Sequence, residues 1–135
     1  MALILWDDNY SVNVREIDSQ HKKLIAIINE LNGSITDGSE KNVIEKILID
    51  LVEYAAFHFS SEEKYFALYN YPKTNSHMQQ HTLLIDQLKE YINKYKNGIK
   101  DFAPTLLNFL KDWLTNHIVG SDKKYSEYFN KNGIY

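Results

Sequence analysis

Apolar residues recur at helical spacing in four long stretches of this chain. A helix that packs one face against a core places an apolar side chain every three or four residues, whereas a half-buried strand alternates with a period of two. On this criterion we expect four helices, which cover approximately residues 19–36, 40–70, 74–96 and 104–119. A short final helix containing Tyr125 and Phe129 follows them. The pattern predicts an all-α protein.

Residues with capping or helix-breaking preferences mark the ends of these stretches. Asp18 or Ser19 can cap the first helix and Ser39 the second, because their side-chain oxygens accept hydrogen bonds from free backbone N–H groups. Pro104 suits the first turn of the fourth helix, and Gly120 is expected to end it. Because short turns join the helices, the sequence predicts an antiparallel up-down-up-down four-helix bundle.

The residues before the first helix show no helical period. Apolar Tyr10, Val12 and Val14 alternate there with polar residues, which indicates an extended N-terminal arm laid over apolar surface. We expect a single domain because no repeat or linker-like segment divides the chain. Its predicted parts are the arm at 1–17, the bundle at 18–119 and a C-terminal segment at 120–135.

Composition and charge narrow the class of protein. A formal charge of -3 with both signs interspersed gives no electrostatic footprint for nucleic acid or for an anionic membrane, so neither is expected as a partner. The apolar residues after Met1 run directly into Asp7 and Asp8 and lack the features of a signal peptide, so we expect a cytoplasmic protein. The absence of cysteine excludes disulfides, thiolate zinc sites and iron–sulfur clusters. Any metal must be held by nitrogen and oxygen.

All five histidines fall on the apolar stripes of the four helices. His21 lies near the start of the first helix, His58 near the end of the second, and His117 near the end of the fourth. His77 and His81 begin the third, four residues apart, a spacing that suits chelation of a transition metal. In an up-down-up-down bundle these four helix ends lie together. The sequence therefore predicts that the five imidazoles meet in one layer.

Two carboxylates extend this cluster. Glu62 lies four residues after His58 and shares its helix face, where a carboxylate without a partner would be costly to bury. Asp122 lies five residues after His117, a spacing that does not keep two residues on one face of a regular helix. Gly120 can let the backbone turn so that Asp122 reaches the layer, or Asp122 can simply flank the last helix. The spacing alone does not decide between these alternatives.

The number and type of these donors indicate the metal. Five imidazoles and two carboxylates exceed the needs of one ion and suit a pair of six-coordinate ions bridged by the carboxylates, with one position left open. A zinc hydrolase would use three protein ligands and a nearby base. Imidazole-rich octahedral coordination favours iron. Without a metal, five neutral imidazoles in a dry core would leave too many nitrogens unpaired.

At these residues the sequence resembles the hemerythrins, specifically the single-domain bacteriohemerythrins. The resemblance covers nearly the whole chain: Trp6, IDSQH ending at His21, HFSSEE from His58, Tyr71-Pro72, HMQQH from His77 to His81, and WLTNHIVGSD from Trp113 to Asp122. Ferritin-like di-iron proteins instead use Glu-x-x-His motifs, which are absent here. Two positions depart from the usual pattern, because Asn13 stands where glycine is common and Phe66 replaces a frequent methionine.

The resemblance implies a non-haem di-iron centre with an oxo or hydroxo bridge. Seven side chains are the implied ligands: three histidines of one iron, two histidines of the other, and two bridging carboxylates. They are, in that order, His77, His81 and His117, then His21 and His58, then Glu62 and Asp122. Five apolar side chains are expected to wall the oxygen position as well as pack the core: Leu24, Phe59, Trp113, Leu114 and Ile118.

The activity implied by the resemblance is reversible dioxygen binding, for oxygen storage, delivery or sensing, without enzymatic turnover. An oxidoreductase that processes peroxide or nitric oxide or oxidises iron on the same centre is the main alternative, and a bundle held together by zinc is another. The sequence offers no second polar substrate pocket and no acid or base beyond the ligands, which favours the carrier. The expected partners are dioxygen and an unidentified recipient protein that consumes it.

Overall fold

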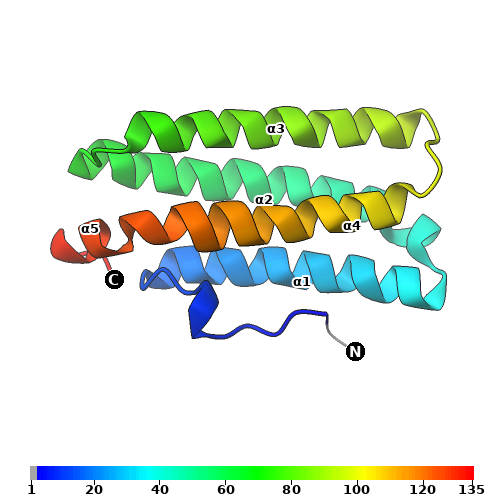
Figure 1. Ribbon diagram of the computed structural model, residues 1–135, viewed down its shortest axis with the longest axis horizontal. Helices are drawn as coiled ribbons and strands as arrows, with labels where there is room; N and C mark the ends of the chain where they lie inside the picture. Colours follow the sequence, from blue (N-terminus) through cyan, green and yellow to red (C-terminus); the bar gives the residue numbers. More distant parts are fainter. Residues whose placement is uncertain (1–2) are drawn as a thin grey trace.

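The structure, a computed structural model, describes residues 3–135 and contains four long helices that run alternately up and down (Figure 1). They are α1 (Arg15–Asp37), α2 (Glu40–Tyr69), α3 (Thr74–Lys96) and α4 (Phe102–Asp112). A π-helical segment, η2 (Trp113–Ser121), continues α4, and a 3₁₀ turn, η3 (Asp122–Tyr125), leads into the short α5 (Ser126–Lys131). Each long helix contacts its neighbours in the order α1, α2, α3, α4, and α4 returns to α1. The predicted all-α, up-down-up-down bundle is confirmed.

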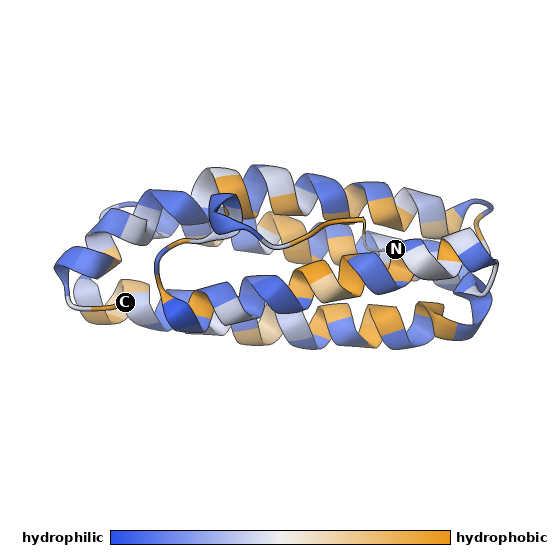
Figure 2. Ribbon diagram, turned by 90° about the horizontal axis from the view of Figure 1, so that it is seen from below, coloured by the Kyte–Doolittle hydropathy of each residue, from blue (hydrophilic) through white to orange (hydrophobic). Residues whose placement is uncertain are grey.

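The N-terminal arm lies beside α1 and crosses the face of the bundle seen in Figure 2. Residues 3–14 form no regular element apart from a 3₁₀ turn, η1 (Asp8–Tyr10). The arm is fastened at Ile4, whose N–H donates to Asn29 Oδ1 (2.9 Å) and whose carbonyl accepts from Asn29 Nδ2 (2.8 Å). Val12 and Val14 are buried, as expected for an arm laid over apolar surface. Positions 1 and 2 of the predicted arm lie outside the described residues.

The first helix begins earlier than the sequence predicts. It starts at Arg15, so the expectation that Asp18 or Ser19 caps it is wrong. The carboxylate of Asp18 instead accepts hydrogen bonds from the Val12 N–H (2.8 Å) and the Ser11 hydroxyl (2.6 Å). Its partners therefore come from the arm, which a local capping pattern cannot reveal.

Asn13 adopts a left-handed backbone conformation between the arm and α1, with φ 57°. Glycine takes this conformation without strain, and asparagine tolerates it better than most residues do. Asn130 Nδ2 from α5 donates to the Asn13 carbonyl at 3.0 Å and helps to hold this turn. The asparagine therefore meets the same backbone requirement that glycine would meet here.

Gly120 does not end the fourth helix, contrary to the prediction. The chain stays helical through it because η2 has wide turns, in which a backbone N–H bonds the carbonyl five residues back. The Asp122 N–H donates to the His117 carbonyl in this way. Wide turns of this kind are rare and concentrate at functional sites.

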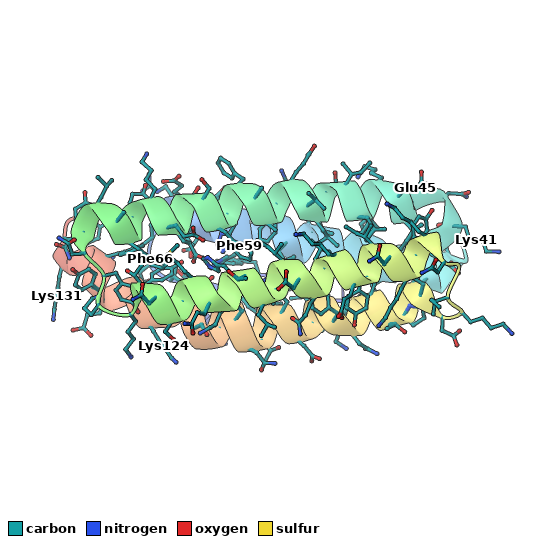
Figure 3. The ribbon with its side chains drawn as sticks, turned by 90° about the horizontal axis from the view of Figure 1, so that it is seen from above. Lys41, Glu45, Phe59, Phe66, Lys124 and Lys131 are labelled. Carbon is teal, nitrogen blue, oxygen red and sulfur yellow. The ribbon has the colours of Figure 1, made fainter. Side chains whose placement is uncertain are left out.

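Two apolar clusters fill the bundle and leave a polar layer between them. The larger cluster includes Leu24 on α1 and Phe59 on α2 and extends to the end far from α5. The smaller cluster includes Ile17 on α1 and Phe66 on α2 and lies toward α5. Figure 3 shows Phe59 and Phe66 in the space between α2 and α3, with Phe66 closer to α5. On α1, His21 therefore lies between Ile17 of the smaller cluster and Leu24 of the larger one. On α2, Glu62 lies between Phe59 of the larger cluster and Phe66 of the smaller one.

A transmembrane helix is not found in the described part of the chain. Across residues 3–135, no helix is both long enough and apolar enough to cross a bilayer.

Candidate metal centre

Seven polar side chains converge in the layer between the two apolar clusters. Five are histidines and two are carboxylates, and none is more than 4% exposed. They are His21 on α1, His58 and Glu62 on α2, His77 and His81 on α3, His117 on η2 and Asp122 at the start of η3. The structure thus brings together every side chain that the sequence nominates as a ligand.

The seven residues form two overlapping groups. In each group one nitrogen or oxygen atom per residue lies within 4.8 Å of the corresponding atoms of the others. One group is Glu62, His77, His81 and His117; the other is His21, His58, Glu62 and Asp122. Glu62 belongs to both, so the layer offers two adjacent sites that share a carboxylate.

Asp122 divides its two oxygens between the two groups of histidines. Oδ2 lies 3.0 Å from His21 Nε2 and 3.3 Å from His58 Nε2. Oδ1 lies 2.8 Å from His77 Nε2 and 3.1 Å from His117 Nε2. A carboxylate that turns one oxygen toward each group has the orientation needed to bridge two neighbouring cations.

The π-helical turns of η2 explain how Asp122 reaches the layer. In a regular α-helix, residues five apart point in directions that differ by roughly 140°. The wider turns of η2 bring His117 and Asp122 to the same side, and no sharp turn at Gly120 is needed. This resolves the position of Asp122, which the spacing alone left open.

Glu62 connects the two groups through one oxygen and is anchored through the other. Oε1 lies 2.9 Å from His81 Nε2, 3.4 Å from His58 Nε2 and 3.5 Å from His77 Nε2. Oε2 accepts a hydrogen bond from the hydroxyl of Tyr125, which is completely buried. Tyr125 is absent from the sequence-predicted site because its place on an apolar stripe hides the role of its hydroxyl.

Some of the short contacts in the layer are not hydrogen bonds. His77 Nε2, His117 Nε2 and Asp122 Oδ1 are buried and lack a hydrogen-bond partner, although each nitrogen lies within 3.1 Å of that oxygen. Buried polar atoms without partners cost free energy. A cation among them would satisfy all three atoms, and imidazole with carboxylate is a donor set that transition metals prefer. The residues present therefore fit a metal site.

Three of the histidines are oriented from behind by a second residue. In each case Nδ1 contacts an oxygen that can only accept, so Nδ1 donates the hydrogen bond, and Nε2 is the nitrogen that faces the layer. The pairs are His58 with Gln20 (2.7 Å), His81 with Glu63 (2.7 Å) and His117 with Gln80 (2.9 Å). Bonds of this kind orient histidines for metal binding. Sequence reasoning missed these three partners, although each of them directly adjoins a predicted ligand.

The electrostatics of the layer keep both carboxylates ionised. Burial and the charge of Asp122 raise the pKa of Glu62, but His58 and the neighbouring imidazoles outweigh them and lower it to about 2. Burial also opposes ionisation of Asp122, yet His117 and the other histidines hold its pKa well below the usual range. Burial lowers the pKa of His77, but the two adjacent carboxylates raise it to about 9. Glu62 and Asp122 are therefore negatively charged and available to bind a cation.

Apolar and aromatic side chains enclose the layer. The five residues predicted to wall the oxygen position are all buried: Leu24, Phe59, Trp113, Leu114 and Ile118. The Phe59 ring stacks on the His81 imidazole, with centroids 3.9 Å apart. Phe66, in place of the frequent methionine, meets His77 edge-on at 5.0 Å. Trp113 and the outer side of His117, where Gln80 lies, line a surface groove of about 350 Å³.

Comparisons with known proteins agree with this geometry. Residues 12–129 match the family described as the hemerythrin HHE cation binding domain. A bacteriohemerythrin from Stenotrophomonas maltophilia is 30% identical over 127 residues, covering 94% of this chain and 82% of the relative. A hemerythrin-like protein from Naegleria gruberi is 33% identical over 120 residues, covering 89% and 88%. A crystal structure of a hemerythrin mutant superposes with a TM-score of 0.84 at 30% identity, covering 94% of this chain and 97% of that one.

Proposed function

This chain belongs to the hemerythrin family, whose members have a non-haem iron centre, and we propose that it binds dioxygen reversibly at a di-iron centre. Such binding serves oxygen storage, delivery or sensing, with a recipient protein that consumes the oxygen where delivery is the role. The proposal depends above all on Asp122, whose two oxygens face two separate groups of histidines. Members of the family are in general oxygen-binding proteins rather than enzymes, which also supports it.

The proposed ligand assignment follows the two groups. One iron would be held by the three histidines near Asp122 Oδ1 and Glu62, and the other by the two near Asp122 Oδ2. His77, His81 and His117 would hold one iron and His21 and His58 the other, and Glu62 and Asp122 would contribute carboxylate oxygens to both. When bound, the iron pair supplies the electrons that reversible dioxygen binding requires. The ionised carboxylates offset its positive charge in a layer from which water is excluded.

The residues around the open position have a second proposed role, which is to keep protons away. Leu24, Leu114 and Ile118 are aliphatic and buried, and Phe59 and Trp113 add aromatic surface. These side chains exclude water and external proton donors from the position where oxygen binds. Exclusion of protons favours the return of dioxygen unchanged over irreversible oxidation of the centre.

Anaerobic reconstitution of the full chain with ferrous iron tests the proposal. Absorption spectra are recorded before air, after air and after degassing, together with the oxygen taken up and returned. A carrier regains its starting spectrum and returns the oxygen. Continued oxygen consumption with a reductant, peroxide, nitric oxide or ferrous iron would instead identify an oxidoreductase, and a protein that gains no oxygen-dependent absorption would refute both readings.

A further inference from the structure

The histidines of the layer differ in the charge of the residue that holds their outer nitrogen. His81 Nδ1 lies 2.7 Å from a carboxylate oxygen of Glu63. His58 and His117 make the corresponding bond to the neutral amide oxygens of Gln20 and Gln80. The geometry is similar in the three pairs, so the main difference between them is the negative charge behind His81.

A carboxylate acts on an imidazole more strongly than an amide does. A hydrogen bond to an ionised acceptor is roughly twice as strong as one between neutral groups. By drawing the Nδ1 proton outward, the carboxylate increases the electron density on the opposite nitrogen, which makes the imidazole a better metal ligand. His81 Nε2 faces the layer, 2.9 Å from Glu62 Oε1, so the effect of Glu63 is delivered into the proposed site.

The effect of the Glu63 charge on His81 can be separated from its effect on the position of the His81 ring, because Phe59 also fixes that ring. The two rings are nearly parallel, with an interplanar angle of 10° and centroids 3.9 Å apart, and His81 is buried. The orientation of His81 therefore does not rest on Glu63 alone. Removal of the Glu63 charge with retention of a hydrogen-bond acceptor should leave the ring in place.

Glu63 itself lies outside both ligand groups. Its carboxylate meets His81 from the side opposite the layer, and its side chain is 33% exposed. Because Glu63 is partly in contact with water, solvent screening moderates its influence on the buried histidine. Glu63 can therefore act on a metal only through His81.

We propose that Glu63 is a positioning residue that makes His81 the strongest nitrogen donor of the layer, tightening metal binding at the group formed with His77 and His117 and favouring oxidised iron there. The effect on affinity applies to any divalent transition metal. The effect on oxidation state rests on the proposed function, because it requires iron at this group. The sequence places Glu63 directly after Glu62, yet the two glutamates have different tasks: one faces the metal and the other faces away.

Zinc binding to the metal-free protein tests donor strength without redox chemistry. Competition with a chromophoric chelator should show that Glu63→Gln weakens zinc binding about tenfold to a hundredfold, as removal of outer partners of metal-bound histidines does. Gln80→Glu places a carboxylate behind His117 and should strengthen binding. Glu53→Gln, an equal change of charge at an exposed position of α2, should leave the affinity unchanged. Equal affinities of Glu63→Gln and Glu53→Gln would overturn the proposal.

The midpoint potential of the iron-loaded protein separates charge from position. Spectroelectrochemical titration should give a more positive potential for Glu63→Gln and a more negative one for Gln80→Glu, each with two irons still bound. A potential unchanged in Glu63→Gln but shifted in Glu63→Ala would reduce Glu63 to a steric support and overturn the proposal. If the wild-type chain takes up no iron pair, the proposed function fails, whereas the zinc comparison still decides the role of Glu63.

Discussion

The two halves of the bundle use the same helical stripe for different purposes. In the half far from α5, the stripe buries hydrocarbon completely: Ile28, Leu31, Ile47, Leu51, Leu106 and Leu110. In the half near α5, it buries titratable groups just as completely: His21, His58, Glu62 and Asp122. Each buried leucine or isoleucine contributes roughly 1.5–3 kcal/mol to folding, whereas buried charges cost free energy unless they are paired.

Helix α2 shows the change within one element. Its stripe runs through Ile47 and Leu51 and then, without a break in period, through His58 and Glu62. The periodicity therefore fixes which residues face inward but not whether their burial stabilises the protein. The two apolar clusters hold the bundle together, and the polar layer between them depends on what it binds.

Glu62→Ala should have the largest effect on the polar half of the bundle. The side chain belongs to both candidate ligand groups, so its loss removes a potential oxygen ligand from each. We expect iron content to fall from about two per chain toward one or none, because each candidate site loses one of its potential oxygen ligands. Iron analysis after desalting measures this, with Glu53→Ala as the exposed control on the same helix. Two irons retained in Glu62→Ala would contradict the bridging role.

Leu51→Ala should damage the apolar half and leave the polar half intact. Leu51 is fully buried, and truncation of such a leucine costs about 2–5 kcal/mol through lost contacts and a residual cavity. Denaturant unfolding should show this loss in both the metal-free and the iron-loaded protein, at unchanged iron content. Loss of iron at a matched folded fraction would mean that the two halves are coupled more tightly than their separate packing indicates.

The dependence of stability on pH should identify the polar half in the metal-free protein. The pKa of Glu62 is lowered to about 2, so its contribution is complete above the ordinary value of 4.5 and is lost as the pH falls toward 2. The pKa of His77 is raised from 6.5 to about 9, so its contribution is complete below 6.5 and is lost as the pH rises through 9. Stability should therefore be greatest between about pH 4.5 and 6.5.

Thermal unfolding of chelator-treated protein across this range measures the profile. Leu51→Ala should lower Tm at every pH without changing the shape of the curve, since no titratable group is removed. A Tm that stays constant from pH 6.5 to 9 would show that His77 gains nothing from its carboxylate neighbours.

The contrast between the halves also explains what the sequence could reveal. Apolar spacing located all four helices, and the alternation of helix direction brought His21, His58, His77 and His117 to one level. This worked because 3.6 residues per turn and short connections constrain the geometry strongly. The helix stop at Gly120 was wrong because the chain continues through it in the π-helical turns of η2, a rare conformation that a glycine stop signal does not anticipate.

The outer partners of the histidines were beyond sequence reasoning for a related reason. Gln20 on α1 reaches His58 on α2, and Glu63 on α2 reaches His81 on α3. Each bond crosses between helices, so it depends on the relative height and rotation of two elements rather than on spacing within one. For the same reason the cap expected at Asp18 was wrong, because its partners lie in the arm.

Leu114 lies at the boundary between the two halves, and we expect Leu114→Ala to have the smallest effect. Leu114 is buried on η2, three residues before His117, and belongs to the apolar cluster that encloses the proposed oxygen position. Its truncation should admit water and accelerate autoxidation by roughly tenfold, which corresponds to about 1.4 kcal/mol in the barrier. The rate is followed as the decay of the oxygenated absorption band in air.

Leu110→Ala, equally buried but on α4, should destabilise the bundle without accelerating this decay. Equal acceleration in both variants would mean that autoxidation follows global stability, and an unchanged rate in Leu114→Ala would remove this side chain from the wall.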